Sequence, residues 1–373
     1  MPQSQDPIDR REVLKTSSAA LSIGLVSSLA GCTGSGGGGS GNSDGGNDSG
    51  GSGNGSETGT PTSMDSGGEE MEIRLAHTQS PESINVQAVQ SEFIDRLETE
   101  TDGRITFNLE AATLGGSEDN LDATQAGTVD MVIESPIATA TRFAPPYTFT
   151  GDPFVIRDME HYKKVQQEFI FPQSGMNGEI IPQGLRMFHG YRWGNRGFTS
   201  NFPVRTPEDV QGVKLRLPQF DSWVGVWENI GAKPTPVAFD ELYSALETGV
   251  ADASEGPITQ FMSTSLYEVQ THFSVTNHLL GIHHFIMNEE FYQGLNSSDR
   301  ELLLTTIEEA ADDITAKIRE EEQSLLEDAR AEGTTIVPRE EIDRAAFVEA
   351  GTPFLNELAS SEWAVSLEEV QNL

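Results

Sequence analysis

Arg216 stands at the end of a segment that has the pattern of a strand. In QGVKLRLPQF (211–220), apolar residues alternate with Lys214 and Arg216, which is the period of a half-buried strand, and Pro218 then ends the run. Ligands of open α/β sheets bind at the carboxyl ends of the strands. Arg216 is therefore a candidate ligand-binding residue. The alternative is an exposed arginine on the wet face of a strand, and the pattern alone does not separate the two.

Aromatic residues follow on the helix after this strand. Trp223 and Trp227 lie four residues apart on one helix face, which favours a place in the core between helix and sheet, above all for Trp227. Phe220 stands at the start of the helix, nearest the expected crevice, and is the stronger candidate for a ligand contact. Trp193 is a further candidate for a ligand contact, because it lies near the point where the chain is expected to pass between the two lobes that are described below.

Residues that would indicate catalysis or metal binding are scarce. The chain contains neither G-x-S-x-G nor H-E-x-x-H, and its single cysteine is Cys32. The seven histidines, which include His283 and His284, lack the spacing of metal ligands and are interpreted as strand or loop residues. We predict no catalytic residue, no metal site and no cofactor. A pair of carboxylates among the many acids would still suffice for an exported hydrolase, which is one alternative.

The charge balance excludes one class of partner. With 59 acidic and 23 basic residues the formal net charge is −36, and such a chain has no general field that would attract nucleic acid. This acidity indicates a protein from a salt-loving organism, because high salt screens the repulsion that would otherwise loosen the fold. The alternative is a surface that is merely tuned for solubility.

Residues 1–31 have the pattern of an export signal. A region with Arg10 and Arg11 precedes a mildly apolar run of small residues that ends in LAGC. The paired arginines resemble the twin-arginine export motif. LAGC resembles a lipobox, which would make Cys32 the lipidated first residue of the mature chain and anchor it to the outer face of the cell membrane; a buried core thiol is the alternative. The sequence has no run of about twenty apolar residues, so we predict no membrane-spanning helix.

A tether is predicted between this signal and the folded part. Residues 32–70 begin with Cys32 and are rich in glycine and serine, with no basic residue. As a flexible coil this stretch would span roughly 34 Å (root mean square). The sequence also offers three N-x-S sequons, at Asn47, Asn54 and Asn296, as weak candidates for glycosylation.

From residue 71 onward, strand and helix patterns alternate twice. The first series comprises strands at 71–77, 104–110 and 129–134 with helices at 84–100 and around 117–126. The second comprises strands at 213–217, 235–238 and 250–254 with helices at 219–230, 240–248 and from about 257. Such alternation indicates parallel sheets covered by helices, and two series predict two α/β lobes.

One long helix is predicted in the last third of the chain. It begins with a capping box from Ser298 to Glu301 and ends near Gly333, with one apolar stripe along its length. A helix of about 33 residues would be roughly 50 Å long, so we expect it to lie across both lobes. A strand-like segment at 334–338 and a final helical segment follow.

The segment 191–260 resembles the substrate-binding proteins of TRAP (tripartite ATP-independent periplasmic) transporters, the DctP-type family. The matching elements are TPEDVQGVKLRLP, IGAKPTPVAFDELYSALETGVAD and the EGP that follows, and LGGSEDNLDATQAGTVDM and DPFVIRDMEHYKK also fit. The resemblance covers nearly everything from residue 72 onward. It implies a two-lobed, periplasmic-binding-protein-like α/β fold with a hinge. The lobes would comprise 71–193 with 283–332, and 194–282 with 333–373.

The resemblance also implies a binding site. In that family a strand-end arginine holds the carboxylate of the substrate through two hydrogen bonds, and Arg216 matches it; a guanidinium fits this geometry and lysine does not. Arg196 matches a second, assisting arginine. The family commonly has Glu-Asn-Pro where this chain has Glu255, Gly256 and Pro257, and Glu255 is a further predicted ligand-binding residue. The ligand hydrogen bond of the asparagine is therefore absent or supplied elsewhere, and the ligand stays open among dicarboxylates, keto acids, sugar acids, amino acids and zwitterions.

We therefore predict an extracytoplasmic solute-binding protein that closes around a small organic carboxylate. Its partners would be integral-membrane TRAP subunits, which in this family use an ion gradient. A binding protein that reports to a sensor is the other alternative to the exported hydrolase.

Overall fold

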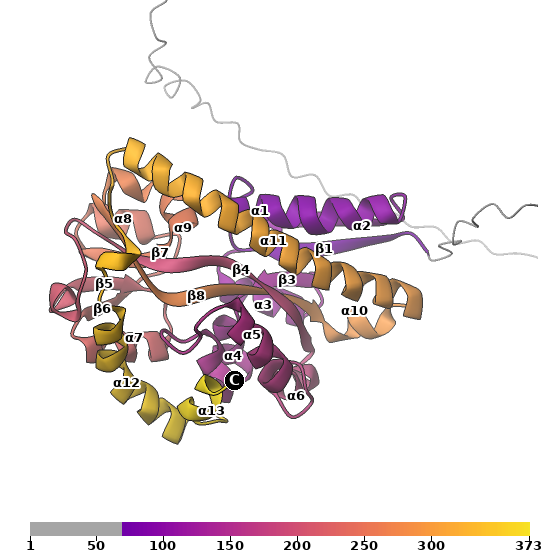
Figure 1. Ribbon diagram of the computed structural model, residues 1–373. Coiled ribbons are helices and arrows are strands. Elements are labelled where there is room, and N and C mark those ends of the chain that lie inside the picture. The colour runs from indigo at the N-terminus through magenta and orange to yellow at the C-terminus, as the bar shows by residue number, and fades with distance from the viewer. Residues whose placement is uncertain (1–68) are drawn as a thin grey trace, which may run out of the picture. The chain divides into compact units, whose positions relative to one another are not determined.

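The computed structural model describes residues 69–373. The predictions for the signal at 1–31, for Cys32, for the tether and for the sequons at Asn47 and Asn54 fall outside the described residues. Within 69–373, nine strands form one mixed sheet (Figure 1). In chain order they are β1 (Met71–His77), β2 (Ile105–Ala111), β3 (Met131–Glu134), β4 (Leu185–Ser200), β5 (Lys214–Leu217), β6 (Lys233–Pro236), β7 (Ala253–Pro257), β8 (His272–Asn288) and β9 (Thr335–Val337).

The sheet has two outer parts with the same topology. The strand order is β2-β1-β3-β8-β4-β7-β5-β6, with β9 added beside β8. The trio β2-β1-β3 is parallel throughout, and so is the trio β6-β5-β7. In each trio the first strand of the series lies in the middle. The two predicted α/β series are therefore confirmed.

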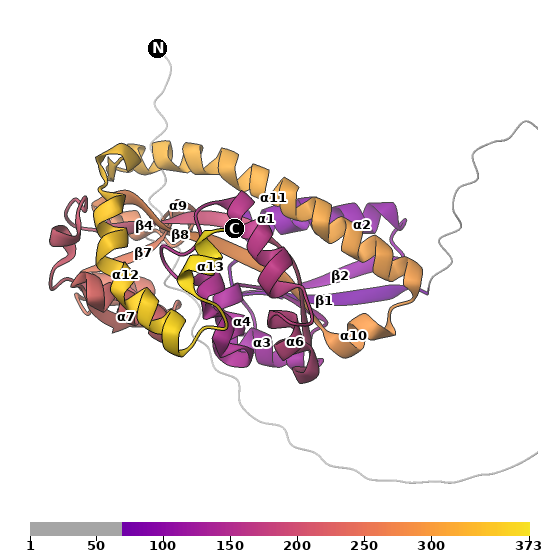
Figure 2. The same cartoon turned by 60° about the horizontal axis from the view of Figure 1, so that its bottom comes forward.

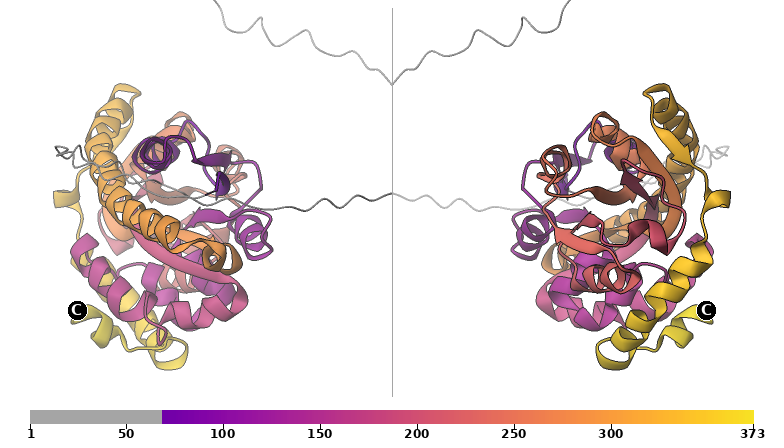
Figure 3. Two further views of the ribbon diagram at one scale, coloured as in Figure 1. Left: turned by 90° about the vertical axis from the view of Figure 1, so that its right-hand side faces the viewer. Right: turned by 90° about the vertical axis from the view of Figure 1, so that its left-hand side faces the viewer.

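Helices cover both faces of this sheet (Figure 3). The predicted helix at 84–100 is α1 (Ile84–Val89) and α2 (Asp95–Glu100), joined by a π-helical turn at Gln90–Ile94. The other predicted helices are found with shifted ends, as α3 (Ser117–Gln125), α7 (Asp221–Ile230), α8 (Leu242–Glu247) and α9 (Ile258–Ser263). The sequence analysis gave no elements for 135–183. This segment forms α4 (Pro136–Phe143), a 3-10 helix (Pro145–Gly151), α5 (Met159–Val165) and α6 (Met176–Ile180).

Two long antiparallel strands, β4 and β8, join the two trios. They have 16 and 17 residues, and both are buried over most of their length. Their pairing shifts register between Arg192 and Gly194, where Gly194 has a φ of +146° that favours glycine. Arg192 lies opposite Ile282 and Gly194 opposite Gly281. The lobe boundaries expected at 193/194 and 282/283 would thus cut both strands at this irregularity.

A single helix, α11 (Ser297–Ala331), runs along the molecule past both trios (Figures 1 and 2). Its 35 residues correspond to about 52 Å. It packs against α1 and β4 in its first two thirds and against α9 and β9 near its end. The predicted long helix across both lobes is confirmed.

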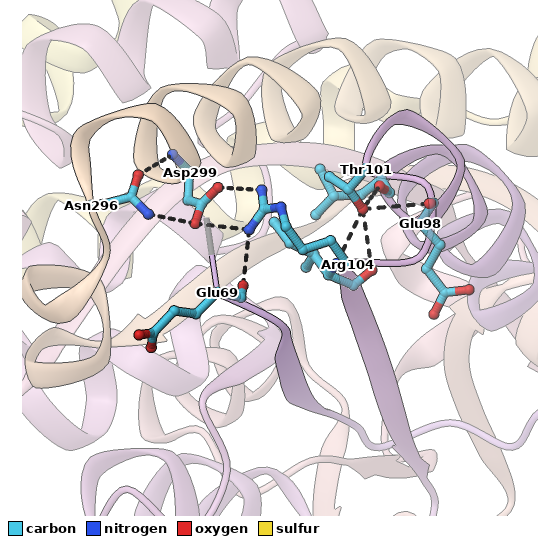
Figure 4. A network of polar contacts seen from close by, with 8 residues as sticks. Glu69, Glu98, Thr101, Arg104, Asn296 and Asp299 are labelled. Carbon is cyan, nitrogen blue, oxygen red and sulfur yellow. Dashed lines mark hydrogen bonds and ion pairs between the residues drawn. The ribbon is translucent and has the colours of Figure 1, made fainter. Parts of the chain in front are cut away.

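The predicted start of α11 is wrong by two residues. The cap is Asn296, whose Oδ1 accepts a hydrogen bond from the backbone N–H of Asp299 at 2.9 Å, so Ser298 lies inside the first turn. The Asp299 carboxylate is held by both terminal nitrogens of Arg104 and by the amide of Asn296 (Figure 4). Arg104 also donates to the backbone carbonyl of Glu69 at 3.1 Å. The first turn of α11 is therefore fastened to the beginning of β1 and β2.

The end of the chain returns to the middle of the molecule. It forms α12 (Arg344–Ser361), which packs on α7, and α13 (Leu367–Gln371). His161 of α5 bonds to the carbonyl of Val370 at 2.8 Å, and Trp363 packs against Phe149. These contacts join the C-terminus, expected in lobe 2, to segments expected in lobe 1.

Candidate functional site

Arg216 is a buried cation with free donors. It lies on β5, between β6 and β7, and is 2% exposed. Its Nε donates to the carbonyl of Val237 at 3.0 Å, and within residues 69–373 neither terminal nitrogen has a hydrogen-bond partner. Burial lowers the pKa of Arg216 to about 10, although Glu255 opposes the shift, so the side chain is charged at neutral pH. Arg216 thus presents two terminal NH2 groups and a full charge in a desolvated place.

Arg196 also points into this region, but it is already paired. It lies on β4 and donates from Nε to Oε2 of Glu255 at 2.5 Å and from Nη2 to Oε1 at 2.7 Å. Glu255, on the neighbouring β7, is fully buried. Burial alone would raise the pKa of Glu255, but the charge and hydrogen bonds of Arg196 lower it to about 2. Glu255 therefore neutralises Arg196.

His278 contacts the carboxylate of this ion pair. Its Nε2 lies 3.1 Å from Oε2 of Glu255, and its Nδ1 lies 2.8 Å from the hydroxyl of Thr276. Burial lowers the pKa of His278, so the ring is neutral at pH 7. A neutral ring that donates from Nε2 to the carboxylate accepts at Nδ1 from the threonine hydroxyl. The carboxylate is thereby held from two sides.

Two tryptophans flank Arg196. Its guanidinium carbon lies 5.0 Å from the ring centroid of Trp223 and 5.6 Å from that of Trp193, within the range of cation–π attraction. Trp193 stacks on His283, with ring centroids 4.6 Å apart. Trp223 donates from Nε1 to the carbonyl of Gly151 at 3.0 Å. Trp193 and Trp223 therefore border the site.

Two other aromatic residues pack beside this group. Trp227 is fully buried in the apolar core, in agreement with its interpretation as a core residue, and it also packs edge-on against His278 at 5.1 Å. Phe220 precedes α7 and packs edge-on against Trp223 at 5.3 Å. A ligand contact from Phe220 stays a prediction.

Sequence reasoning passed over Phe239, which is 44% exposed. It follows β6 and lies two residues after Val237, whose carbonyl accepts from Arg216. A large, exposed apolar side chain two residues from the backbone carbonyl that holds Arg216 is a candidate wall of the site. The position of Phe239 just beyond the carboxyl end of a strand could have identified it from the sequence.

The space beside Gly256, where the family pattern has an asparagine side chain, is filled by a neighbouring residue. A Cβ atom built on Gly256 would lie 2.8 Å from Nε2 of Gln260 in α9, closer than real contacts allow. The side-chain amide of Gln260 thus fills the space that a side chain at 256 would enter.

Polar groups at the ends of β1 and β3 and on the long strands β4 and β8 complete the cluster. His77 ends β1, Glu134 ends β3, and Tyr191 and His283 lie opposite each other on β4 and β8. Burial lowers the pKa of His283 well below its usual value, and nearby His77 and Arg196 lower it further. The carboxyl ends of β1 and β3 and Arg196 of β4 thus lie close to His283 and its neighbour His284. The sequence analysis had interpreted the histidines only as strand or loop residues.

The chemistry of this arrangement suits binding. In the described part of the chain, no three histidine, cysteine or acidic side chains come together in a way that would hold a metal ion.

Among residues 69–373 no helix combines the length and the apolar character that crossing a bilayer requires. A surface pocket of about 580 Å³ lies elsewhere, between β4 and the start of α11, and none of its lining residues belongs to the cluster around Arg216.

Comparison with known proteins gives a consistent result. Residues 75–362 match the family described as bacterial extracellular solute-binding protein, family 7 (DctP). The chain is 30% identical over 295 residues to a solute-binding protein of Roseobacter denitrificans, covering 75% of this chain and 84% of that one. The crystal structure of a TRAP periplasmic solute-binding protein from the same organism, with bound L-galactonate, superposes with a TM-score of 0.68 at 27% identity (78% and 94% of the two chains). A TRAP periplasmic solute-binding protein from a Bordetella species, with density assigned to pantoate, gives 0.72 at 26% identity (81% and 99%).

Proposed function

The chain belongs to family 7 of the bacterial extracellular solute-binding proteins, the DctP family, and from this premise we propose that it captures a small organic carboxylate and delivers it to a TRAP-type secondary transporter. Its relatives of this family are extracytoplasmic binding proteins. The bound molecules named for similar structures, such as L-galactonate and D-erythronate, are organic acids and support a carboxylate ligand.

The observation that supports the proposal most directly is that neither terminal nitrogen of Arg216 has a hydrogen-bond partner among the described residues. A charge that is desolvated without a partner is costly, and a carboxylate that accepts from both terminal nitrogens offsets this cost. The net charge of the protein repels anions, so the attraction must be local. A carboxylate beside Arg216 also fits the electrostatics, because Glu255 already balances Arg196.

Arg196 has a supporting role in this proposal. Its Nε and Nη2 are engaged by Glu255, whereas its Nη1 has no hydrogen-bond partner within residues 69–373. It can therefore add one hydrogen bond to the carboxylate that Arg216 holds. Glu255 would then position Arg196 and would not itself touch the ligand. Trp193 and Phe220 remain candidate walls, together with Phe239.

We further propose how the protein is placed and how it moves. The signal at 1–31, lipidation of Cys32 and the tether at 32–70 would hold it at the outer face of the membrane, next to the integral-membrane TRAP subunits. We propose two lobes, one of residues 71–193 with 283–332 and one of residues 194–282 with 333–373. They would close by rotation at the place where the paired strands β4 and β8 pass from one lobe to the other. The closed form would be the one that the membrane subunits recognise.

The test is a thermal-shift screen of the full chain in molar salt against organic acids, zwitterions and neutral polyols. A ligand at about 100 times its dissociation constant adds about 2.7 kcal/mol to the free energy of unfolding. We expect a shift with one class of carboxylate and none with its uncharged analogue. A shift with the neutral polyols alone would contradict the proposal.

A further inference from the structure

We propose that the ligand is a monocarboxylate whose far end carries hydroxyl groups, and that His77, Glu134, Tyr191 and His283 bind these hydroxyls. This proposal rests on the proposed function, because it takes the carboxylate of the ligand to lie at Arg216. It goes further in choosing among dicarboxylates, zwitterions and hydroxy acids, which the arginines alone do not distinguish.

The four groups come from four strands that lie side by side. The strand order β1-β3-β8-β4 places His77 beside the end of β3, and Glu134 and Tyr191 lie opposite residues of the His283–His284 pair. The ring of His283 lies 5.6 Å from that of His77 and 6.0 Å from that of Tyr191. The charge of Glu134 also acts on Tyr191, since it adds to the rise that burial causes in the pKa of that phenol.

Each group has a buried polar atom without a hydrogen-bond partner among the described residues: Nε2 of His77, Oε2 of Glu134, the hydroxyl of Tyr191 and Nδ1 of His283. Their residues are all less than a tenth exposed. Folded proteins leave few such atoms unpaired, so several on adjacent strands point to a polar ligand.

The chemical character of two of these atoms is defined by their neighbours. Nδ1 of His77 accepts from the backbone N–H of Gln79 at 3.0 Å, and burial lowers the pKa of this ring to about 3. The ring is therefore neutral with its proton on Nε2, which is a donor. Glu134 accepts from the N–H of Ser135 through Oε1 at 2.6 Å. Its Oε2 makes no hydrogen bond of good geometry among the described residues and is an acceptor while the carboxyl is ionised. Burial raises the pKa of this group, and the neighbouring Ser135 and Ser117 partly oppose that rise.

A set that contains both a donor and an acceptor excludes two kinds of ligand. A second carboxylate only accepts, so it would leave Oε2 of Glu134 unmatched and would be repelled by it. Arg192, the cation next to Tyr191, donates from Nη2 to Glu322 at 2.6 Å, and its buried Nη1 has no partner among the described residues. Glu322 balances its charge, so Arg192 offers a second carboxylate no uncompensated charge. An ammonium group only donates, so it would leave Nε2–H of His77 unmatched. A hydroxyl both donates and accepts, and it suits Glu134 in either protonation state.

The test uses four C6 acids that share one carboxylate: hexanoate, L-galactonate, adipate and 6-aminohexanoate. Isothermal titration with the full chain in molar salt gives the dissociation constant of each. We expect L-galactonate to bind at least about 100-fold more tightly than the other three, because a site built for hydroxyls rejects analogues that lack them. We also expect Arg216→Ala to abolish this binding.

Two variants connect the preference to these residues. Glu134→Gln and His77→Phe should each weaken L-galactonate about 10- to 100-fold while leaving the weak affinity for hexanoate unchanged. Thr334→Val, at a buried hydroxyl that is also unpartnered, should change neither affinity.

The outcomes separate the two proposals. Tightest binding of adipate or 6-aminohexanoate, lost in Arg216→Ala, would leave the proposed function standing and overturn the hydroxyl site. Equal weakening of L-galactonate and hexanoate by Glu134→Gln would also overturn it, since the effect would then be structural. Binding of none of the four acids, or binding that survives Arg216→Ala, would overturn the carboxylate clamp and with it this inference.

Discussion

Arg196 and Glu255 form a buried ion pair across the neighbouring strands β4 and β7, through two hydrogen bonds of 2.5 and 2.7 Å. Arg216, on the next strand along, has no such partner within residues 69–373. Arg196 and Glu255 compensate each other, whereas Glu255 and Asp240 act on Arg216 only through their charge, without a hydrogen bond. The trio Arg196, Glu255 and Arg216 therefore carries one net positive charge, which matches the single carboxylate of the proposed ligand.

Arg216→Ala should weaken binding of the ligand found in the screen by at least about 100-fold, because it removes a desolvated, charged hydrogen-bond partner. Arg216→Lys should recover little of this loss, since a lysine lacks the planar fork. The unliganded Arg216→Ala protein should melt no lower than the parent, because an unpaired buried charge has been removed. Titration calorimetry and thermal melts measure both effects. Arg205→Ala, at an exposed arginine paired with Glu341, is the matched control. Undiminished affinity in Arg216→Ala would contradict the assignment.

Glu255→Gln should lower the free energy of unfolding by about 3 kcal/mol at pH 7, because it leaves Arg196 buried without its counter-ion. The pKa of Glu255 is lowered in the folded protein to about 2, so its contribution is present above the usual value of 4.5 and is lost as the pH falls toward 2. Urea unfolding at pH 7 and pH 3 should show the difference between variant and parent shrinking. A difference that is the same at both pH values would show that the charge of Glu255 is not the cause.

Asp152→Asn should stabilise the protein increasingly as the pH rises. Asp152 is 1% exposed, accepts from the hydroxyl of Ser222 at 2.5 Å, and has no partner for Oδ2 among the described residues. Burial raises its pKa from 3.8 to about 8, so between these values the folded state holds a proton that the unfolded state has lost. Stability must then fall with rising pH through this window, by up to about 1.4 kcal/mol per pH unit. The difference between variant and parent, measured by urea unfolding from pH 5 to 8, isolates this one group. Parallel curves would mean that Asp152 does not titrate as described.

Glu322→Gln should cost about 3 to 5 kcal/mol of unfolding free energy. Glu322, on α11, accepts from Nη2 of Arg192 at 2.6 Å and from the backbone N–H of Asn195 at 3.2 Å, so it holds β4 on both sides of Gly194. Glu320→Gln, at an exposed position of the same helix, should change stability by less than about 0.5 kcal/mol. Similar losses in the two variants would contradict a specific role for Glu322.

Asn296→Ala should destabilise the protein by about 1 kcal/mol, the usual effect of losing a helix N-cap. Ser298→Ala should be nearly neutral, because the helix begins before it. The same unfolding measurement compares the two. A larger loss in Ser298→Ala would restore the capping box that the sequence suggested.

The elements with a clear period were predictable, and the connections between distant elements were not. The strands and helices of both trios were found within a few residues, because alternation and helical spacing are local properties. The long strands β4 and β8 were missed, since they are buried on both faces for most of their length and so lack alternation. The 250–254 strand was placed about three residues early, because the turn before β7 also contains apolar residues.

The site was predictable only where a strand end and a charged residue coincided, as at Arg216. Arg196 and Glu255 are 59 residues apart, and no local pattern indicates that they pair. The unpartnered atoms of His77 and Glu134 depend on which strands lie beside theirs. For the same reason the histidines carried no signal in the sequence.

The Arg104 contacts have a mechanical consequence. Arg104 joins the carbonyl of Glu69 to Asp299 in the first turn of α11, and Met71 enters the sheet immediately afterwards. Tension applied to the chain at Glu69 is therefore shared between β2 and the longest helix before it reaches His77, at the other end of β1. The load would enter at the amino ends of β1 and β2, while His77 and the other candidate ligand-binding side chains lie toward the carboxyl ends of their strands. If the proposed anchor holds the molecule by its first residues, a pull on the chain is therefore applied at the end of the strands opposite the proposed binding site.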